Sequence, residues 1–505
     1  MPIRSLAPDS IITGWDFSTG SVKCVAFDLQ GNVVASCRFP TDLWTEDGVS
    51  EFNLMLLEGQ VHTTVRAIVH QLNQLGRLSD WVAGGISATH HTSGRVDALG
   101  NQIRRMICWN DQTLAAYHAK GITRLGGEDA VRALLGGPWA IRYSLSHLVK
   151  DEETLTHADW QRTRWLVPHG CAALGYLTGN WGSISISTAA STGMMQLEQN
   201  EWCEPILNCI QDKNLRQFAW QSLPAIQHDM NLPVSALSPH VASAAGWQGD
   251  AKLPFVFPTL DDQAAGLVGG GAVEAGQVAV ILGNSAVVNS SASAAPGTDA
   301  LDAMKLNWGP WLWMRCYSNG AQFLDRIVGH HPDWQALEQA ARKVPPGCEG
   351  IRVSPFVLTE PSLGIHEPRF GWSPSEPSDA GVRFRAALES LACLITLGVQ
   401  AHQQAGQQIR QITVSGGIAR SQLMLEILAS MLNMPLLQLE SDEGPALGAA
   451  VVALAGAESY QRTAQGITEP FTVQDAVAAI VKFKQPVAAN PEWVSTYQQM
   501  ARDFL

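Results

Sequence analysis

The sequence predicts an α/β protein with more than one domain. Its 505 residues exceed an ordinary single domain and suit two or three hydrophobic cores. Hydrophobic residues make up 46% and charged residues 16%, which is typical of a globular chain. Runs with strand periodicity and runs with helical periodicity both occur along the chain, and the fold class itself follows from a family resemblance described below.

The N-terminal part begins with a predicted β-hairpin. Residues 11–16 are mostly apolar, and residues 22–29 alternate between apolar and polar side chains. A glycine-containing turn follows, and residues 33–37 form the next predicted strand. Apolar residues at helical spacing then predict a helix over 54–75. Residues 81–89 form the next predicted strand.

The middle of the chain gives weaker signals. Residues 128–135 and 158–166 have helical patterns among many Gly, Pro and Ser residues. The apolar run at 254–258 has proline at both ends, which suggests a strand leading across a domain boundary. Residues 278–282 and 287–291 are further strands around a short polar turn.

Two segments of the chain share the same predicted pattern of elements. A strand, a small polar turn and a second strand occur at 11–29 and again at 278–291. Two such hairpins, one in each domain, would suit binding of a polyphosphate through backbone N–H groups. The alternative is that both are ordinary β-turns, and spacing alone leaves the two interpretations open.

Near the C-terminus, the strand-like run 409–414 leads into Gly416 and Gly417. Ser421 then precedes a helical pattern and is a good N-cap, because its hydroxyl can accept a hydrogen bond from the first turn. A strand, two glycines and a helix start allow a ligand to approach the backbone closely. A second glycine-containing element follows at 444–450, after one short strand.

Charge and cysteine content exclude several functional classes. The formal charge of −13 argues against a general nucleic-acid binder, although a local nest of N–H groups can still bind phosphate. Nine scattered cysteines without a C-x-x-C pair indicate reduced thiols and no zinc site. The first ten residues lack the apolar core of a signal peptide, and no run suits a membrane span. We therefore expect a soluble, cytoplasmic protein.

Six short motifs occur in one order over more than 400 residues. They are GWDFSTGSVK at 14–23, the run 86–98 followed by WND at 109–111, DQAAG at 262–266, LGNS at 282–285, SGGIARS at 415–421 and GPALGAA at 444–450. In this order they resemble the motifs of the FGGY family of carbohydrate kinases, and within it xylulokinase most closely. Each motif alone is weak, but the ordered set is specific.

The resemblance implies a fold of two α/β domains of the actin, hexokinase and Hsp70 type, which is ribonuclease H-like, around a central cleft. The expected N-terminal domain spans 1–256 and carries the sugar site and the first phosphate hairpin. The expected C-terminal domain spans 257–505 and carries the catalytic aspartate, the second phosphate turn and the adenosine site. Closure of the two domains on ATP and sugar is a further expectation.

The resemblance also assigns the central chemistry. It implies that Asp262 accepts the proton of a sugar hydroxyl while the γ-phosphoryl group is transferred. It implies that Asp16 holds Mg²⁺, a cation that prefers few protein ligands and several waters. The structural alternatives are a helix cap or turn role for Asp262 and a turn cap for Asp16. Asp261 is interpreted as a turn residue or a supporting residue behind the site.

The remaining matched positions are assigned to substrate and nucleotide. The resemblance implies that the sugar-binding residues are His90, His91, Trp109, Asn110, Asp111 and Gln263. It implies that the nucleotide-binding residues are Thr19, Gly20, Ser21, Gly283, Asn284, Ser285, Gly416, Gly417, Ile418 and Ser421. Plain structural roles stay open for several of these: Trp109 and Ile418 could be core residues, the histidine pair could lack any ligand, and Lys23 could be a solvated hairpin residue.

The chain departs from the family pattern at four places. Ser18 replaces a glycine in the first hairpin, which would cost strain if that position needs a positive φ. Asn284 replaces a threonine of the second phosphate turn. The sequence THHT at 89–92 stands where xylulokinases have QMHG, and this departure falls in the expected sugar pocket. The loop 354–369 lacks the usual GERxP run.

The sequence thus predicts ATP-dependent, Mg²⁺-assisted phosphorylation of a primary hydroxyl of a small sugar, a ketopentose such as xylulose first. Ribulose, erythritol, glycerol and fuculose are alternative substrates. A nucleotide- or sugar-binding sensor on the same fold, with little turnover, is the alternative from another functional class. Small-molecule substrates are the expected partners, without nucleic acid or membrane, and a homodimer is left open.

Overall fold

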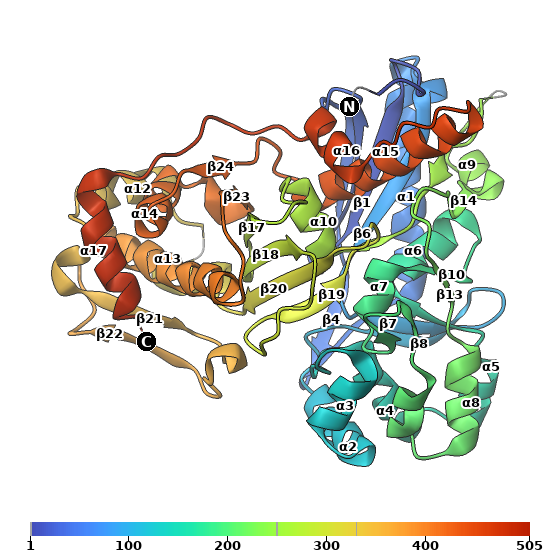
Figure 1. The fold of residues 1–505 in the computed structure, drawn as a ribbon, viewed down its shortest axis with the longest axis horizontal. Helices are drawn as coiled ribbons and strands as arrows, with labels where there is room; N and C mark the ends of the chain where they lie inside the picture. The colour runs from blue at the N-terminus through green and yellow to red at the C-terminus, as the bar shows by residue number, and fades with distance from the viewer. Residues whose placement is uncertain (1–2, 249–250, 330, 505) are drawn as a thin grey trace. The chain divides into compact units, whose positions relative to one another are not determined.

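The computed structural model describes residues 3–248, 251–329 and 331–504, which form two compact units. Unit 1 comprises the residues up to Gly269 together with Met304–Trp311 and Pro445–Val481. Unit 2 comprises Gly270–Ala303, Leu312–Gly444 and the residues from Lys482 onward. Figure 1 shows the ribbon of both units.

The predicted boundary between residues 256 and 257 differs from this division, because the strands on either side of it join one sheet. β15 (Phe255–Val256) and β16 (Leu260–Asp261) both pair in parallel with β6 (Trp81–Ala88). The chain therefore leaves unit 1 only after helix α10 (Asp262–Gly269). It later returns with α15 (Gly444–Ala464) and with α16 (Val473–Ile480).

The main sheet of unit 1 has the strand order β14-β15-β6-β1-β2-β3. The N-terminal hairpin is confirmed: β1 (Ile11–Phe17) pairs antiparallel with β2 (Ser21–Asp28), which pairs with β3 (Val33–Pro40). β1 also pairs in parallel with β6, with Asp16 beside Ser87. The carboxyl ends of β1, β6 and β16 therefore meet at one edge of the sheet.

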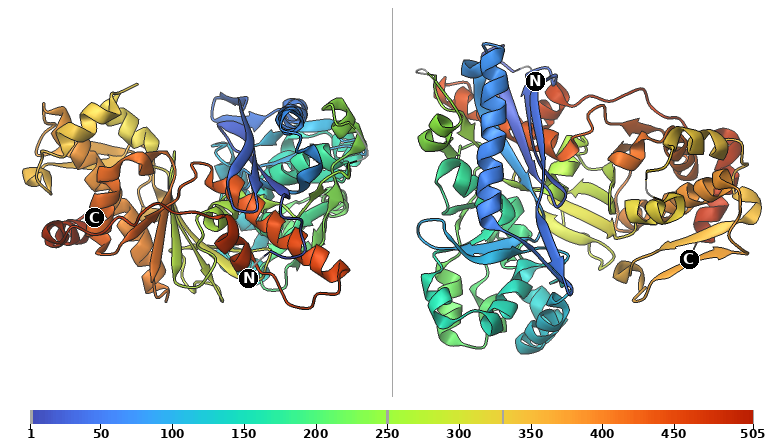
Figure 2. Two further views of the ribbon diagram at one scale, coloured as in Figure 1. Left: turned by 90° about the horizontal axis from the view of Figure 1, so that it is seen from above. Right: turned by 180° about the vertical axis from the view of Figure 1, so that it is seen from behind.

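Helices cover both faces of this sheet. The Trp15 indole N–H donates to the Thr64 hydroxyl of α1 (Leu54–Gln74) at 3.1 Å, and Figure 2 shows α1 lying along the sheet. Gly14 points to the other face, where an added Cβ would lie 1.8 Å from the carbonyl oxygen of Ala446 in α15. Only glycine allows this close approach of helix to strand. The predicted helix over 54–75 is confirmed.

The rest of unit 1 is a smaller sheet of order β4-β5-β8-β7-β9 with helices around it. The helical prediction for 158–166 is wrong after Arg162, because β9 begins at Trp165 and pairs with β7. The remaining elements are β4 (Leu43–Glu46), β5 (Val49–Phe52), η1 (Leu78–Asp80), β7 (Ser93–Val96), β8 (Gln102–Ile107), α2 (Leu114–Leu125), α3 (Glu128–Leu135), α4 (Ser144–Thr154), α5 (His157–Arg162), β9 (Trp165–Pro168), α6 (His169–Thr178), β10 (Ser183–Ser185), α7 (Ile186–Ala190), β11 (Met195–Gln196), β12 (Glu201–Trp202), η2 (Glu204–Cys209), α8 (Lys213–Gln221), β13 (Ala225–Gln227), β14 (Ser235–Ala236) and α9 (Pro239–Ala244).

Unit 2 repeats the arrangement of the first sheet. β17 (Gln277–Leu282) pairs antiparallel with β18 (Ala286–Ala292) and in parallel with β23 (Gln411–Ser415), as β1 pairs with β2 and β6. The two hairpins that share a sequence pattern therefore also share the same arrangement of paired strands. The other elements are β19 (Asp302–Lys305), which crosses between the units, β20 (Trp311–Tyr317), α11 (Ala321–Val328), α12 (Trp334–Ala341), η3 (Cys348–Gly350), β21 (Arg352–Phe356), η4 (Pro361–Leu363), β22 (Arg369–Ser373), α13 (Ala380–Gln404), η5 (Gly417–Arg420), α14 (Gln422–Leu432), β24 (Leu436–Gln438) and α17 (Pro491–Arg502).

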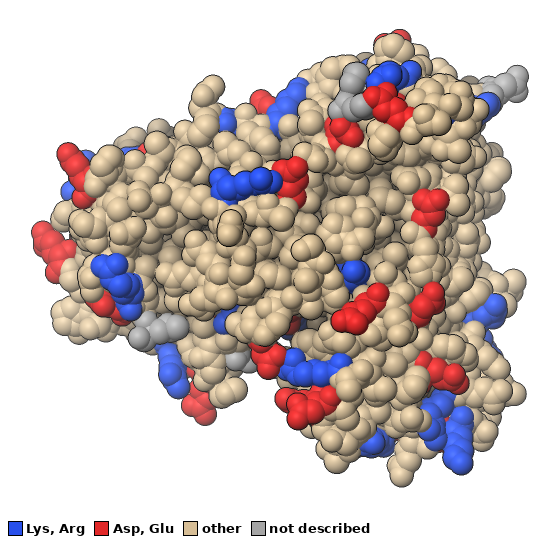
Figure 3. All heavy atoms as spheres, viewed as in Figure 1, with Lys and Arg blue, Asp and Glu red and all other residues tan. Residues whose placement is uncertain are grey.

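Two further observations concern the class of protein. Among the helices of the described residues, none has the length and apolarity that crossing a membrane requires. On the face drawn in Figure 3, acidic and basic side chains are interspersed and form no continuous basic stripe. The second observation agrees with the formal charge of −13.

Candidate active site

The predicted cation ligand and the predicted base lie at the same sheet edge of unit 1. Asp16 is the next-to-last residue of β1 and is 2% exposed. Its carboxylate accepts a hydrogen bond from the Ser87 hydroxyl at 3.2 Å and lies 3.5 Å from the Lys23 ammonium. The parallel pairing of β6 with β1 and β16 brings Asp261 and Asp262 to this edge.

Asp261 caps the helix that begins at Asp262. One of its carboxylate oxygens accepts from the backbone N–H groups of Gln263 and Ala264, at 3.0 and 2.9 Å. The other accepts from the hydroxyl of Ser187 at 2.6 Å. These contacts agree with the interpretation of Asp261 as a turn and supporting residue, since its side chain fixes the start of α10.

Asp262, the first residue of α10, lies in an electrostatically unfavourable place for a carboxylate. Burial raises the pKa of its carboxyl from the usual 3.8 to about 8, and the negative charges of Asp261 and Asp16 contribute to the increase. The Gln263 side-chain amide donates to it at 3.3 Å, which opposes the increase. A carboxyl group with a pKa this close to neutrality suits the acceptance of a proton from an alcohol.

The two predicted sugar-site histidines form a buried stack. The rings of His90 and His91 are 3.5 Å apart and nearly parallel, and the His91 ring lies 4.3 Å from that of Tyr143. His91 has a positive φ of 58°, which is unusual for a residue other than glycine. The surrounding contacts therefore hold this turn in an unfavourable conformation.

His91 is arranged as a hydrogen-bond acceptor. Its Nδ1 lies 2.6 Å from the carbonyl oxygen of Ser191, so Nδ1 carries the proton. Burial, together with nearby positive charge, lowers the pKa of His91 well below its usual value, so the ring is neutral at pH 7. In the described structure its Nε2 is buried without a hydrogen-bond partner. A ligand hydroxyl would satisfy this lone pair.

The three residues of the WND segment differ in burial: Trp109 is exposed, Asn110 is half-buried and Asp111 is buried. The Trp109 side chain is 39% exposed, so it is no core residue. The Asn110 side-chain oxygen is buried without a hydrogen-bond partner among the described residues. Asp111 is 3% exposed, and its carboxylate accepts from the Thr113 N–H at 2.8 Å and the Lys150 ammonium at 3.1 Å. Asp111 thus fixes the turn that presents Trp109 and Asn110.

The first phosphate hairpin keeps its turn without glycine at position 18. The Ser18 hydroxyl donates to the carbonyl oxygen of Ser21 at 2.8 Å, and the Ser18 N–H donates to the same oxygen at 3.0 Å. Ser18 is not among the residues with positive φ, so the substitution carries no backbone strain. Gly20 is exposed, and nothing lies within 4 Å of the position that its Cβ would occupy. Thr19 is half-buried and Ser21 is 5% exposed, so the turn leaves space for a ligand at its tip.

Unit 2 contains a cavity of about 780 Å³, which falls in the size range of small-molecule sites. It is lined by five of the predicted nucleotide residues, Gly283, Asn284, Gly417, Ile418 and Ser421, whereas Ser285 and Gly416 are not on its wall. Gly416 has a φ of 96°, and an added Cβ would lie 2.3 Å from the carbonyl oxygen of Leu282. Gly416 therefore shapes the turn, whereas Gly417, with nothing within 4 Å of a Cβ, opens onto the cavity.

The helix start beyond the glycines is as predicted. The hydroxyl of Ser421 accepts from the N–H of Met424 at 3.2 Å and caps α14. Ile418 is half-buried; it packs against the core of unit 2 and lines the cavity as well. Ile418 is therefore a partly buried residue at the cavity wall, and its contact with a nucleotide stays a prediction.

Sequence reasoning missed the opposite wall of this cavity and the support of the carboxylates. Helix α12 lines the cavity with Trp334, Glu338 and Arg342, at helical spacing. No glycine motif marks this helix, and only its apolar–polar periodicity could have indicated it. Ser187, which holds Asp261, lies 74 residues away in the sequence and carries no motif signal.

The motif at 444–450 has a packing role within unit 1. An added Cβ at Gly448 would lie 1.9 Å from the carbonyl oxygen of Ala265, in the helix that begins at Asp262. Gly448 therefore allows α15 to lie directly against α10. A residue with a side chain would displace α10, which carries Asp262.

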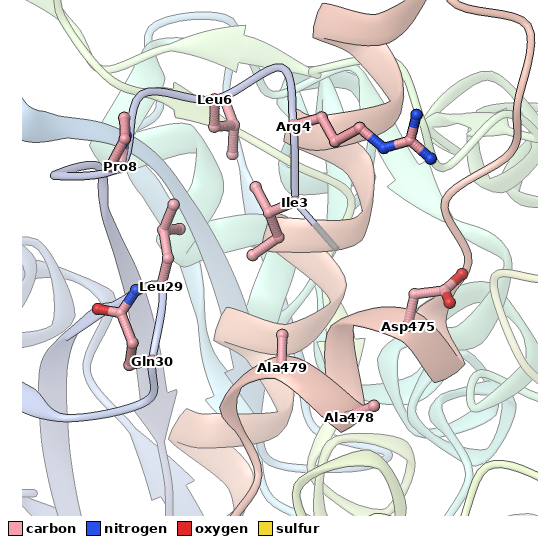
Figure 4. A pocket seen from close by; sticks show the side chains of 9 residues that line it. All are labelled: Ile3, Arg4, Leu6, Pro8, Leu29, Gln30, Asp475, Ala478 and Ala479. Carbon is pink, nitrogen blue, oxygen red and sulfur yellow. The ribbon is translucent and has the colours of Figure 1, made fainter. Parts of the chain in front are cut away.

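A separate pocket of about 490 Å³ in unit 1 holds none of the predicted site residues. Figure 4 shows its walls, which come from the N-terminal segment, the turn after β2 and helix α16. Its lining is Ile3, Arg4, Leu6, Pro8, Leu29, Gln30, Asp475, Ala478 and Ala479. Asp475 is engaged in the capping box of α16, so this pocket offers little polar chemistry.

Known proteins share this sequence pattern and fold. The chain is 26% identical over 473 residues to the xylulose kinase of Escherichia coli K12, which covers 87% of this chain and 89% of that protein. It is 24% identical to the gluconokinase of Bacillus subtilis, over 88% of this chain and 87% of that protein. The crystal structure of a xylulose kinase from Brucella ovis superimposes with a TM-score of 0.82, at 21% identity and 98% coverage of both chains. This structural similarity shows the fold of two-domain sugar kinases.

Two domain families match the chain directly. Residues 11–269, more than half of the chain, match the N-terminal domain of the FGGY family of carbohydrate kinases. Residues 333–457 match the C-terminal domain of the same family. The fold, the ordered motifs and these two matches agree. The chain therefore belongs to the FGGY family of carbohydrate kinases and is a sugar kinase.

Proposed function

We propose that the protein transfers the γ-phosphoryl group of ATP to a primary hydroxyl of a small ketopentose, xylulose first, with Asp262 as the base. Membership of a kinase family implies ATP use, and the sugar and the site residues are the parts proposed here. The observation that carries the proposal is the raised pKa of Asp262 at the start of α10, next to the buried His90 and His91. Several relatives are xylulose kinases, which favours the ketopentose.

In the proposed reaction, the substrate hydroxyl donates a hydrogen bond to the Asp262 carboxylate and passes its proton to it as the O–P bond forms. The sugar oxygen thereby becomes the nucleophile, and ADP leaves with the electrons of the broken bond. Asp261 acts through the backbone, since its contacts fix the first turn of α10 and the direction of Asp262.

The carboxylates suit a hard divalent cation. Asp16 is buried, offers only oxygen atoms and raises the pKa of Asp262 through its negative charge. Mg²⁺ held by Asp16 would neutralise part of this charge and that of the ATP phosphates. Lys23, 3.5 Å from Asp16, supplies a compensating charge within the protein.

The proposed nucleotide site is the cavity of unit 2. Its volume of about 780 Å³ suits a nucleoside, and the backbone of the half-buried Gly283 and the exposed Gly417 allows close contact. Trp334 is 49% exposed on its wall and offers a face for an aromatic base. The turns at 19–21 and 283–285 are the proposed phosphate contacts.

The proposed sugar site is around His91, Asn110 and Trp109 of unit 1. The unpaired Nε2 of His91 and the side-chain oxygen of Asn110 are acceptors that sugar hydroxyls can satisfy. Trp109 supplies an apolar wall for the sugar carbons. Asp111 acts by orienting the turn, since Thr113 and Lys150 occupy its carboxylate.

The decisive measurement is ATP turnover in a coupled assay against a panel of ketoses, aldoses, sugar acids and polyols. We expect xylulose to give the highest kcat/KM. We expect Asp262→Ala to lower the sugar-stimulated rate by roughly three orders of magnitude, because the base and its placement are lost together. Asp229→Ala, which removes an exposed carboxylate of the same unit, is the matched control and should keep the wild-type rate.

Three outcomes separate the parts of the proposal. A different preferred substrate, such as ribulose, erythritol, glycerol, fuculose or gluconate, would replace the ketopentose and leave the reaction class intact. Full activity of Asp262→Ala would remove Asp262 as the base. Absence of stimulation by every sugar would favour a binding protein with little turnover.

A further inference from the structure

His90, Asp261 and Asp262 form a compact cluster of potential metal ligands. One ring nitrogen of His90 and one carboxylate oxygen of each aspartate all lie within 4.8 Å of one another. His90 is 6% exposed and Asp261 is 1% exposed, so these two donors are buried, and Asp262 is half-buried beside them. This convergence of an imidazole with two carboxylates is distinct from the proposed Mg²⁺ ligand Asp16.

The surroundings fix the direction of each donor. The His90 ring stacks on His91 at 3.5 Å, and His91 is held by its hydrogen bond to the Ser191 carbonyl. Asp261 is held by Ser187 and by the first turn of α10, and its Oδ2, which among the described residues accepts only from the Ser187 hydroxyl, keeps one lone pair for a cation. Donors that are fixed by a surrounding shell bind a metal with less loss of freedom.

The donor set selects the kind of cation. Mg²⁺ prefers oxygen ligands and keeps several waters, so an imidazole nitrogen gives it little advantage. Zn²⁺ accepts a mixed set of one imidazole and two carboxylates and commonly completes a tetrahedron with water. The histidine therefore favours a transition metal over the cation that accompanies ATP.

We propose that His90, Asp261 and Asp262 bind Zn²⁺, and that the bound ion inhibits the kinase by engaging the carboxylate of Asp262. The binding part stands on the cluster alone. The inhibitory part rests on the proposed role of Asp262 as the base. Inhibition is competitive with the sugar, because the ion and the hydroxyl require the same carboxylate.

The test uses the metal-free full-length protein without sugar or nucleotide. Binding of Zn²⁺ is measured by competition with a chromophoric zinc chelator, for the wild type and for His90→Met, which keeps the side-chain length and removes the nitrogen donor. We expect His90→Met to weaken one zinc site by about 100-fold or more, since even residues that only orient a ligand typically contribute 10–100-fold. Asp262→Asn, which keeps the shape of the side chain, should weaken the same site.

The matched control is His70→Met, which removes an exposed histidine of α1 and should bind Zn²⁺ as the wild type does. Thermal melting of each variant shows that it is folded. Equal zinc affinity and stoichiometry in the wild type, His90→Met and Asp262→Asn would overturn the site.

The inhibitory part has its own readout. With a sugar that supports turnover, we expect added Zn²⁺ to raise the KM for that sugar without lowering kcat, and a chelator to restore the original KM. Binding of Zn²⁺ at His90 without any change in the KM would overturn the inhibition and keep the site. Because zinc binding is measured without substrate, it would still test the metal site even if no sugar substrate were found.

Discussion

Each unit buries a cluster around a carboxylate, and the two clusters differ in how their charge is compensated. In unit 2, Glu389 is 1% exposed and accepts from the Arg385 guanidinium at 3.0 Å, the Tyr497 hydroxyl at 2.9 Å and the Gly347 N–H at 3.0 Å. In unit 1, burial raises the pKa of Asp262 to about 8, and the negative charges of Asp261 and Asp16 add to the increase.

The comparison separates a structural carboxylate from a functional one. The partners of Glu389 come from α13, α17 and the turn before β21, so this charge joins three segments of unit 2. Asp262 accepts hydrogen bonds from the Gln263 amide and the His90 backbone, but its charged neighbours Asp261 and Asp16 are also negative, so its environment costs stability for the ionised form. A buried acid whose charge is left uncompensated indicates a site that awaits a ligand, whereas a saturated one indicates a fixed core.

The largest expected effect is that of Asp262→Asn, which should abolish turnover and spare the fold. We expect kcat to fall by roughly three orders of magnitude, because the amide cannot accept the proton. The folded-state pKa of about 8 lies above the usual 3.8, so ionisation destabilises the wild type increasingly as the pH rises from about 4 to 8. The melting temperature of the variant should therefore match the wild type near pH 4 and exceed it at pH 8.

Thermal melting at the two pH values, together with the kinase assay, checks this prediction. A melting temperature lower than that of the wild type at pH 8 would show that Asp262 is a stabilising residue, as Glu389 is expected to be.

The opposite behaviour is expected for Glu389→Ala. Removal of this carboxylate leaves the Arg385 guanidinium buried without its partner, which typically costs about 3–5 kcal/mol. Chemical denaturation should show the loss in unit 2, while kcat per folded molecule changes little. The control Glu376→Ala removes an exposed partner of Arg383, 57% exposed, and should change the unfolding free energy by at most about 1 kcal/mol. A variant that melts like the wild type would remove the structural role of Glu389.

The sequence was sufficient to predict those features of the fold and the candidate site that depend on neighbouring residues. Alternation and turn residues predicted the hairpin at β1 and β2, and the hydroxyl of Ser421 predicted the start of α14, because these features depend on neighbouring residues. The ordered motifs predicted the family and its fold. The place of Asp262 within an ordered series gave the candidate base.

The remaining features depend on contacts between residues that are distant in the sequence. The sequence did not show that α15 packs on β1 and α10, because only the close approach at Gly14 and Gly448 reveals it. The predicted helix over 158–166 failed because pairing with β7 makes a strand from Trp165. Likewise, no motif indicated the hydrogen bond that Lys150 donates to Asp111, which lies 39 residues away in the sequence.

The smallest expected effect concerns the pH dependence of activity. It tests why the pKa of Asp262 is raised, in contrast to the well-paired Glu389. If Asp262 must be ionised to act, log kcat/KM should rise by about one unit per pH unit below pH 8 and level off above it. Asp261→Asn removes one of the repelling charges while its remaining side-chain oxygen can still cap α10. The pKa of Asp262 should then fall, so the rising limb of the profile moves to lower pH, and activity at pH 6 increases relative to that at pH 8. If Asp261→Asn changes kcat but leaves the rising part of the pH profile at the same pH, Asp261 acts only by holding the start of α10. Burial alone would then set the pKa of Asp262.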